Sequence, residues 1–386
     1  MKFELTDDQR MLREGAARYL EKSYEFRQRL ELARTGGGFS RSTWQAFADM
    51  GWLAAGISEA HGGLGFGPIE LALIAEELGR HLVLEPFTAC GVLPASLIAR
   101  VADDAQRGGR LPAIAAGECL YAVASSEPDA RADLTRVKAR AEPLPGGRWK
   151  LDGRKSLVVG APIADRLLIV ARAGGGAGDM QGLSVFDVTK EMPGLRIAAC
   201  ALVDGTPAAD LILDGVVVGS DALLGAAGGA GPGLQHAFDE AIVVQCAETV
   251  GALEDVLGLC SEYLRTRKQF GVAIGSFQVL QHRMADMAIE TSQARASLHR
   301  GLQALTVGAP ERRGVDVSGV KAQVLKSARF VTQQGIQLHG GYGITEEYRV
   351  GHHWRRLLVT DGLFGSHSYH IARYAQRIQR QCAGHD

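Results

Sequence analysis

Apolar positions recur with two different periods along this chain, and the change of period divides it into three regions. Residues 1–118 carry apolar side chains at helical spacing, interrupted at glycine and proline. In residues 119–224 apolar and polar positions alternate, or β-branched residues run together, and both patterns are typical of strands. Residues 225–386 return to long helical patterns. The order predicts an α+β fold of three domains, with a helical N-terminal domain, a central β domain and a C-terminal helical region.

Individual elements can be placed within these regions. Thr6 before an acidic first turn predicts a helix over residues 5–24. Further helices are predicted over 43–52, 70–80, 234–266 and 277–305. Strands are predicted over 120–124, 135–141, 166–171, 183–188 and 211–218. The glycine-rich residues 173–182 predict an exposed loop, and 225–233 a flexible connection.

Composition and charge argue against several classes of protein. With 386 residues, 46% of them hydrophobic, the chain can bury a large core without a disulfide or a metal. Lys and Arg number 42 against 43 Asp and Glu, which argues against a general nucleic-acid binder. No apolar run approaches the roughly 18 residues of a membrane span, and the chain starts with acids where a targeting peptide has bases. The six cysteines lack zinc spacing, so we expect reduced thiols in a cytoplasmic enzyme.

Two features resemble cofactor or metal sites, but a structural role explains each better. The glycine-rich stretch 59–67 follows no predicted strand and lacks the G-x-G-x-x-G spacing, so it predicts a turn rather than a dinucleotide site. No i, i+4 pair of histidines joins a third ligand in a metal-binding arrangement. We therefore predict no metal site and assign structural or surface roles to His61, His339, His352, His353, His367 and His370.

Six groups of short strings carry the most specific signal. They are Met50-Gly-Trp-Leu with Gly62-Gly-Leu-Gly, Glu76-Glu-Leu-Gly, Leu151-Asp-Gly-Arg-Lys, Tyr263-Leu-Arg-Thr-Arg-Lys-Gln-Phe-Gly with Ile274-Gly-Ser-Phe-Gln, Met284-Ala-Asp-Met, and Gln337-Leu-His-Gly-Gly-Tyr-Gly. In this order, and over essentially the whole chain, they resemble the acyl-CoA dehydrogenase family. The segment from Arg355 to Gly365 is similar to a subgroup, the small subunits of pimeloyl-CoA-type dehydrogenases and the paired dehydrogenases of steroid side-chain breakdown.

The resemblance implies a fold, a cofactor and a reaction. The central domain should be β-barrel-like, and the C-terminal region a four-helix bundle that mediates oligomerisation. Family members bind FAD and act on an acyl-CoA thioester. A carboxylate takes the α-proton while a hydride leaves the β-carbon for the flavin, which gives a trans-2-enoyl-CoA. Electron-transfer flavoprotein is the expected acceptor, and a related dehydrogenase chain is the expected partner in a heterotetramer.

The resemblance also implies cofactor contacts. Arg267 matches a guanidinium that reaches the pyrophosphate of a neighbouring subunit's FAD, and Phe270 matches a ring beside the adenosine. Gln278 belongs to the same strings. Gln337, Gly340 and Gly341 match a segment whose backbone approaches the cofactor, which glycine permits. The alternative is that Arg267 forms a surface ion pair and the two glycines only end a helix.

The flavin-ring side departs from the family pattern. Where members carry Trp and, two places on, a hydroxyl residue, this chain has Leu157 and Val159. Ser126 can replace the usual hydroxyl of the first β segment. Either backbone groups hold the ring, or a partner chain supplies that half of the site.

The catalytic base departs as well. Phe364 stands where most members have Glu, and Ala241 where others do. Glu248 lies seven residues after Ala241, on the same helix face within about 20° and about 10.5 Å further along. Apolar neighbours raise the pKa of a carboxylate, which suits a base, so we predict Glu248 as the base. The alternative is an acidic stripe with Asp255 and Glu262. Asp361 is a weaker base candidate, otherwise a cap or an ion-pair partner.

Three functions remain open from the sequence. The first is a subunit of an FAD-dependent acyl-CoA dehydrogenase for a bulky or dicarboxylic acyl-CoA, with Glu248 as base. The second is a non-catalytic partner that completes the FAD site of a heteromeric dehydrogenase, which Leu157, Val159 and Phe364 support. The third is a flavin oxidase or monooxygenase on the same scaffold.

Overall fold

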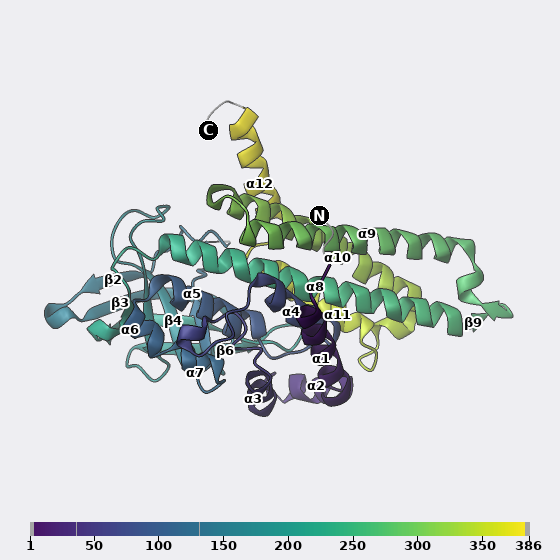
Figure 1. The fold of residues 1–386 in the computed structure, drawn as a ribbon, viewed down its shortest axis with the longest axis horizontal. Coiled ribbons are helices and arrows are strands. Elements are labelled where there is room, and N and C mark those ends of the chain that lie inside the picture. The colour runs from purple at the N-terminus through teal and green to yellow at the C-terminus, as the bar shows by residue number, and fades with distance from the viewer. Residues whose placement is uncertain (1–3, 36, 131, 383–386) are drawn as a thin grey trace. The chain divides into compact units, whose positions relative to one another are not determined.

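The computed structural model describes residues 4–35, 37–130 and 132–382 (Figure 1). By contacts it forms two compact units. The helical unit contains the chain up to Glu31, Ala72–Val83 and everything from Ile242 onward. The β unit contains Leu32–Leu71 and Leu84–Ala241. The predicted boundaries at 118 and 224 do not coincide with these units, and the three-domain division stays a prediction.

The N-terminal helices begin where local caps place them. Helix α1 (Asp7–Ser23) opens with a capping box, in which the Thr6 hydroxyl accepts from Gln9 N and the Gln9 side chain accepts from Thr6 N. Helix α3 (Arg41–Asp49) is capped by Ser40. Other helices of this region are α2 (Phe26–Arg34), α4 (Pro68–Arg80), the π-helix η2 (Phe87–Val92), α5 (Leu93–Val101), α6 (Asp104–Gly108) and α7 (Leu111–Ala115). The predicted helices over 5–24, 43–52 and 70–80 are thereby confirmed, with shifted ends.

The glycine-rich stretch 59–67 is a turn, as predicted. A short 3-10 helix, η1 (Glu59–His61), ends at Gly62, whose φ is 79°. Gly65 also has a left-handed φ, of 64°. These conformations suit glycine because it has no Cβ.

The β unit is built around one mixed sheet of eight strands. Its strands are β1 (Tyr121–Ala124), β2 (Arg140–Pro143), β3 (Trp149–Val159), β4 (Arg166–Arg172), β5 (Leu183–Thr189), β6 (Leu195–Ala201), β7 (Pro207–Val218) and β8 (Leu223–Leu224). Their order is β6-β7-β3-β2-β4-β5-β8, with β1 parallel to β4. Strand β4 is central, since residues 167–171 are fully buried. The sheet with its helical surroundings confirms the predicted fold class.

One predicted strand needed correction, and the strands β3, β6 and β8 were not predicted. The strand predicted over 135–141 begins only at Arg140, because two backbone donors before it, Lys138 N and Ala139 N, go to the Glu127 carboxylate rather than to a strand. The edge strand β6 was not predicted, because most of its residues are exposed and so lack a buried alternation.

The long C-terminal helices belong to the helical unit from Ile242 onward, and they lie side by side in Figure 1. Helix α8 (Gly231–Thr266) is followed by the hairpin β9 (Lys268–Gln269) and β10 (Val272–Ala273), the 3-10 helix η5 (Ile274–Ser276), α9 (Gln278–Thr306), α10 (Pro310–His339), η6 (Gly340–Ile344), α11 (Val350–Gly362) and α12 (His367–Cys382). Helix α10 packs against α9, α11 and α12. The helices predicted over 234–266 and 277–305 are confirmed as α8 and α9, and the bundle agrees with the one that the family resemblance implied. No helix in the described residues is long and apolar enough to cross a membrane.

Candidate active site

Arg267, Phe270 and Gln278 lie around the hairpin that follows α8. Phe270 and Gly271 form its tip with φ values of 54° and 81°, and such a turn usually carries asparagine before glycine. A phenylalanine there is strained, and its ring is 91% exposed. The ring meets only the edge of Phe277, with centroids 6.1 Å apart, among the aromatic contacts of the described residues. The backbone therefore holds a large apolar ring in the open, as a ligand or partner contact requires.

Gln337, Gly340 and Gly341 lie at the C-terminal end of α10, and all three are exposed. Gly340 has φ 59° and ψ −138°, and its N–H donates to Gln337 O as the helix ends. Open space surrounds the position of a Cβ at either glycine. This backbone is therefore accessible to a ligand.

An aromatic cluster brings these two groups to one end of the bundle. Tyr263, one turn before Arg267, packs on His339 with ring centroids 4.4 Å apart and stacks with Tyr342 at 6.1 Å. Helices α9 and α10 are also joined nearby, since Arg283 Nη1 donates to Gln334 Oε1 at 2.8 Å. The six predicted cofactor residues thus gather at one end of the helical unit, although they come from separate strings.

These residues fit the diphosphate and adenosine part of a dinucleotide. Arg267 is exposed and forms no ion pair within the described residues, which weakens the surface ion-pair alternative. A free guanidinium can bind a phosphate through two N–H groups, the Gly340-Gly341 backbone permits close approach, and the Phe270 ring can cover a base. The donor set therefore matches the expected group.

The flavin-ring residues lie in the β unit and are apolar. Leu157 has a left-handed φ of 53°, is 38% exposed, and donates its N–H to Asp210 Oδ1 at 3.0 Å. Val159 is nearly buried at 9% exposure. Ser126 is tied to β3, since its carbonyl accepts from Ser156 N at 3.0 Å. This half of the site offers backbone groups and the Ser126 hydroxyl, but no aromatic cover.

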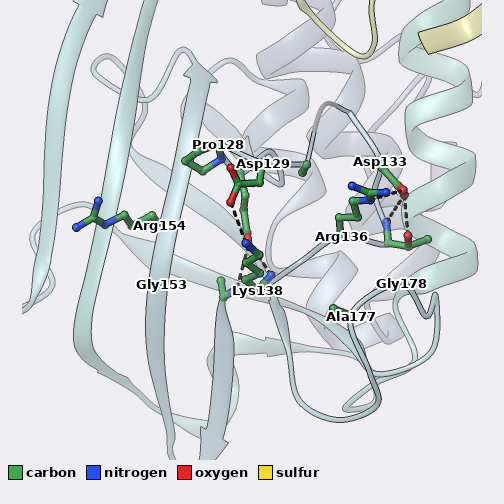
Figure 2. A pocket seen from close by; sticks show the side chains of 13 residues that line it. Pro128, Asp129, Asp133, Arg136, Lys138, Gly153, Arg154, Ala177 and Gly178 are labelled. Atoms are coloured by element: carbon green, nitrogen blue, oxygen red, sulfur yellow. Dashed lines mark hydrogen bonds and ion pairs between the residues drawn. The ribbon is translucent and has the colours of Figure 1, made fainter.

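A cavity of about 910 Å³ opens beside the Ser126 segment (Figure 2). Its rim carries both signs of charge. Lys138 Nζ lies 2.8 Å from Asp129 Oδ2, and Arg136 Nε 3.3 Å from Asp133 Oδ2. These two cations have a carboxylate partner, whereas Arg154, which also lines the cavity, forms no ion pair within the described residues.

Glu248 lies where α8 crosses α4. A Cβ added at Gly79 would overlap the Glu248 carbonyl, and one at Gly251 would overlap the Glu76 carbonyl. The two backbones therefore touch at glycine. Residues 242–247 beside it are buried, while Glu248 itself is half-buried.

The three carboxylates of the acidic-stripe alternative have different environments. Asp255 is buried and accepts from Arg349 Nη2 at 2.6 Å and from His353 Nε2 at 2.8 Å. Glu262 is exposed. Asp255 therefore serves an internal ion pair, and the three do not form one solvated stripe.

Phe364, at the position of the usual family base, lies in a tight turn between α11 and α12. Phe364 has φ 57° and Gly365 φ 106°. Asp361 caps the turn, because its Oδ1 accepts from His367 N at 2.8 Å while Oδ2 lies 3.2 Å from Arg329 Nη2. Asp361 thus has the cap and ion-pair role that was its default interpretation.

Lys321 is a buried cation beside this region, and the sequence analysis missed it. It is fully buried on α10, where Nζ donates to Gln245 Oε1 and, at 3.1 Å, to Thr360 O. Burial lowers its pKa to about 8, against the raising effects of Cys246, Asp361 and Glu248. Both carboxylates proposed as bases therefore act on one buried ammonium group.

The buried histidines are neutral structural groups. Burial lowers the pKa of His352 to about 4 and that of His370 to about 3, and it lowers the pKa of His339 and His353. Within the residues that the structure covers, no three His, Cys, Asp or Glu side chains are arranged to hold a metal ion.

Comparison with known families accounts for nearly the whole chain. Models of the acyl-CoA dehydrogenase N-terminal, middle and C-terminal domains match residues 6–118, 122–216 and 233–379. This chain belongs to the acyl-CoA dehydrogenase family. It is accordingly an FAD-dependent oxidoreductase of the acyl-CoA dehydrogenase type. When bound, the flavin accepts the hydride, and the residues above are those that would hold it.

Individual relatives are distant but match over their full length. Acryloyl-CoA reductase (NADH) of Anaerotignum propionicum is 28% identical over 99% of this chain and 97% of its own. Benzylmalonyl-CoA dehydrogenase of Aromatoleum aromaticum is 27% identical, over 93% and 95% respectively. A chain in the solved ChsE4-ChsE5 complex from Mycobacterium tuberculosis is 25% identical and has a TM-score of 0.86 over 99% of both chains.

Proposed function

We propose that this chain is one subunit of a heteromeric acyl-CoA dehydrogenase that introduces an α,β double bond into a bulky or dicarboxylic acyl-CoA. The observation that carries the proposal is the Phe364 turn. The backbone forms a tight turn at the family's usual base position, but Phe364 supplies no carboxylate there. Ala241 supplies none at the position where other members carry the base. Ala241 is smaller than a glutamate, which would suit a larger acyl group at that position.

The proton acceptor in this proposal is Glu248. It lies one helix turn after Gln245, whose side chain accepts from the buried Lys321, and Glu248 is among the groups that raise the pKa of that lysine. The resemblance to benzylmalonyl-CoA dehydrogenase supports a bulky, dicarboxylic substrate class. We propose that an electron-transfer flavoprotein takes the electrons. A cytoplasmic location stays a prediction from the cysteine pattern.

A related chain as partner is supported from two sides. Arg267, Phe270 and the glycine segment are exposed and suited to a cofactor held by a neighbour, while Leu157 and Val159 leave the flavin-ring half incomplete. A chain of a two-protein complex is among the similar structures. The alternative is a non-catalytic partner, which the half-buried position of Glu248 at the α4 crossing favours.

Co-expression tests the proposal. The chain is produced alone and together with a neighbouring dehydrogenase gene product, and flavin content and flavin reduction by an acyl-CoA panel are measured. We expect full flavin loading and reduction only for the pair. A flavin-saturated, active oligomer of this chain alone would contradict the paired-subunit proposal. Rapid oxygen consumption with hydrogen peroxide release would favour the oxidase instead.

A further inference from the structure

Two loops of the β unit line the cavity shown in Figure 2. One, residues 127–130 and 132–139, leads into β2, and the other, residues 173–182, joins β4 to β5. Arg136 of the first loop lies on the same side of the cavity as Gly178 of the second (Figure 2). The volume of about 910 Å³ is within the range of roughly 300–1,000 Å³ that is typical of small-molecule sites. The shape of this cavity therefore depends on how the two loops are held.

Arg172, the last residue of β4, holds both loops. It is buried, and its five hydrogen bonds, one from Nε and two from each Nη, equal the number of N–H donors of an arginine. All five acceptors are backbone carbonyls at 2.8–3.4 Å, namely Thr135 O and Val137 O of the first loop and Gly174 O, Asp179 O and Gln181 O of the second. Because the guanidinium is planar and rigid, it sets the distance between the loops.

The two loops also meet directly at Thr135. Its carbonyl accepts from Gly178 N at 3.1 Å as well as from Arg172 Nη2 at 2.8 Å. The base of the second loop is closed by Ala173 N, which donates to Gly182 O at 2.8 Å. Thr135 and Gly178 both line the cavity, so the relative position of these two parts of its wall depends on Arg172.

Arg172 also brings a positive charge to the wall of the cavity. The guanidinium group is charged, and no carboxylate of the described residues lies within ion-pair distance of it. Its Nη2 group is bonded to the carbonyl of Thr135, a residue that lines the cavity. An uncompensated charge at this place favours an anion in the cavity.

The rim offers further cations to such an anion. Arg154 lines the cavity from β3, is exposed and forms no ion pair within the described residues. Lys138 and Arg136 pair with Asp129 and Asp133, but the side chains of these two cations are 69% and 67% exposed. Because exposed ion pairs contribute little, both cations can turn toward a ligand of higher charge. The diphosphate and the 3′-phosphate of coenzyme A are groups of this kind.

We infer that Arg172 is a positioning residue for the phosphate-bearing arm of the acyl-CoA substrate. It holds the two loops at the spacing at which the three cations of the rim bind the phosphates. Arg172 itself is not among the residues that line the cavity, so it acts through the loops. The inference rests on the proposed function, which makes an acyl-CoA the substrate and assigns the flavin ring to the neighbourhood of the Ser126 segment, next to this cavity.

The test separates the arm from the acyl group. Flavin reduction in the flavin-loaded protein with its partner is measured with isovaleryl, glutaryl and benzylsuccinyl thioesters. Each acyl group is carried by coenzyme A and, in parallel, by pantetheine, which lacks the diphosphate and the nucleotide. Arg172→Lys keeps the charge but has fewer donors than the guanidinium. Arg140→Lys is the matched control, because Arg140 lies opposite Arg172 on β2, is exposed and does not line the cavity.

A positioning role predicts a change in binding of the arm alone. We expect Arg172→Lys to raise KM for acyl-CoA at least about tenfold with kcat nearly unchanged. KM for acyl-pantetheine should stay at the wild-type value, because the cavity then has no phosphate to bind. Arg140→Lys should resemble the wild type with both kinds of thioester.

A second measurement uses the wild-type complex and needs neither turnover nor a variant that folds. Backbone hydrogen exchange is compared with and without free coenzyme A, and inorganic phosphate at the same concentration is a separate probe. We expect coenzyme A to slow exchange in residues 132–139 and 173–182 together. Inorganic phosphate should leave both segments unchanged.

The inference would be overturned if coenzyme A protected neither segment, or if inorganic phosphate protected both equally well. It would also be overturned if KM in Arg172→Lys were unchanged, or rose equally for acyl-pantetheine. If Arg172→Lys does not fold, the exchange experiment on the wild type decides. A wild type whose flavin no acyl thioester reduces, but in which coenzyme A protects both segments, would contradict the proposed function and still support binding of the arm.

Discussion

Lys155 and Glu127 form a buried ion pair in the β unit, with Nζ 2.7 Å from Oε1 and both side chains almost inaccessible. The same carboxylate accepts from Lys138 N and Ala139 N, and Lys155 also donates to Ser125 O. One pair thus fastens the Ser126 segment to β3, which carries Leu157 and Val159, the residues that we propose for the flavin-ring half of the site.

We expect Lys155→Met to lower the free energy of unfolding by about 3–5 kcal/mol, because it leaves a buried carboxylate without its cation. Chemical unfolding, followed by tryptophan fluorescence, measures the change. Lys150→Met in the same strand is the control, since its pairs with Glu142 and Asp152 are partly exposed and contribute little. Equal effects of the two substitutions would show that the buried pair has no special role.

The crossing of α4 and α8 gives a prediction about packing. Gly79→Ala should destabilise the helical unit by several kcal/mol, because the new methyl group overlaps the backbone of Glu248 and neither helix can yield locally. Gly258→Ala is the matched control within α8. Open space surrounds that position, so alanine should stabilise the helix by roughly 0.5–1 kcal/mol. Thermal unfolding compares the two, and a neutral Gly79→Ala would mean that the helices are not in backbone contact.

Helices that depend on neighbouring residues were predicted well. Features that depend on residues far apart in the sequence were missed. The Thr6 cap and the apolar period of α8 lie within a few neighbouring residues, so the sequence alone reveals them. The failed strand over 135–139 depends on Glu127, which lies 11 and 12 residues from the N–H groups that it takes. Periodicity contains no information about such a competing acceptor.

The candidate site divides in the same way. Family strings made Arg267 and the Gly340-Gly341 segment candidates for the site. That these two segments lie near each other depends on the packing of Tyr263 on His339, which the strings do not contain. Lys321 was missed because its burial depends on Gln245 and Thr360, which are 76 and 39 residues away. A lysine within the apolar run Val-Lys-Ala-Gln-Val-Leu was the one signal that could have drawn attention to it.

The cofactor assignment predicts a loss of flavin without a loss of folding. Arg267→Ala should lower flavin retention after gel filtration, because a bidentate contact to the diphosphate is removed from an exposed position. Arg265→Ala, two residues earlier and also exposed, should retain its flavin. The flavin absorbance per folded oligomer measures both. Equal retention in the two variants would remove Arg267 from the cofactor site.

Lys321 predicts an unusual pH dependence of stability. Its pKa is lowered from 10.5 to about 8 in the folded chain, so between these values the unfolded chain holds the proton and the folded chain does not. Stability therefore rises with pH over this window. Cys246 and Glu248 of α8, Asp361 of α11 and His370 of α12 are the titratable groups that face it.

Lys321→Met should lack this component. We expect the free energy of unfolding of the wild type, relative to the variant, to increase by about 1–2 kcal/mol between pH 7.5 and 9.5. Denaturant titrations at both pH values measure it, and taking the difference cancels the other titrating groups. Parallel pH profiles for the two proteins would show that Lys321 keeps an ordinary pKa.

The proposed base gives the sharpest prediction about activity. Glu248→Gln keeps the shape of the side chain, so the α4 crossing and flavin binding should be retained, but it removes the proton acceptor. Acyl-CoA-dependent flavin reduction should then fall by at least the roughly 10²-fold typical of losing a positioned base. Asp361→Asn should be much milder, because Asp361 is engaged by His367 N and Arg329.

The control for this experiment is Glu262→Gln, which changes an exposed carboxylate on the same helix and should leave the rate unchanged. The pH profile adds a second criterion, because a base beside Lys321 should lose activity as pH falls through its own titration, and Glu248→Gln should abolish that limb. If Glu248→Gln reduces flavin at nearly the wild-type rate, the carboxylate that takes the α-proton belongs to the partner chain. This chain would then contribute the Phe364 turn and the exposed cofactor residues, which is the non-catalytic alternative.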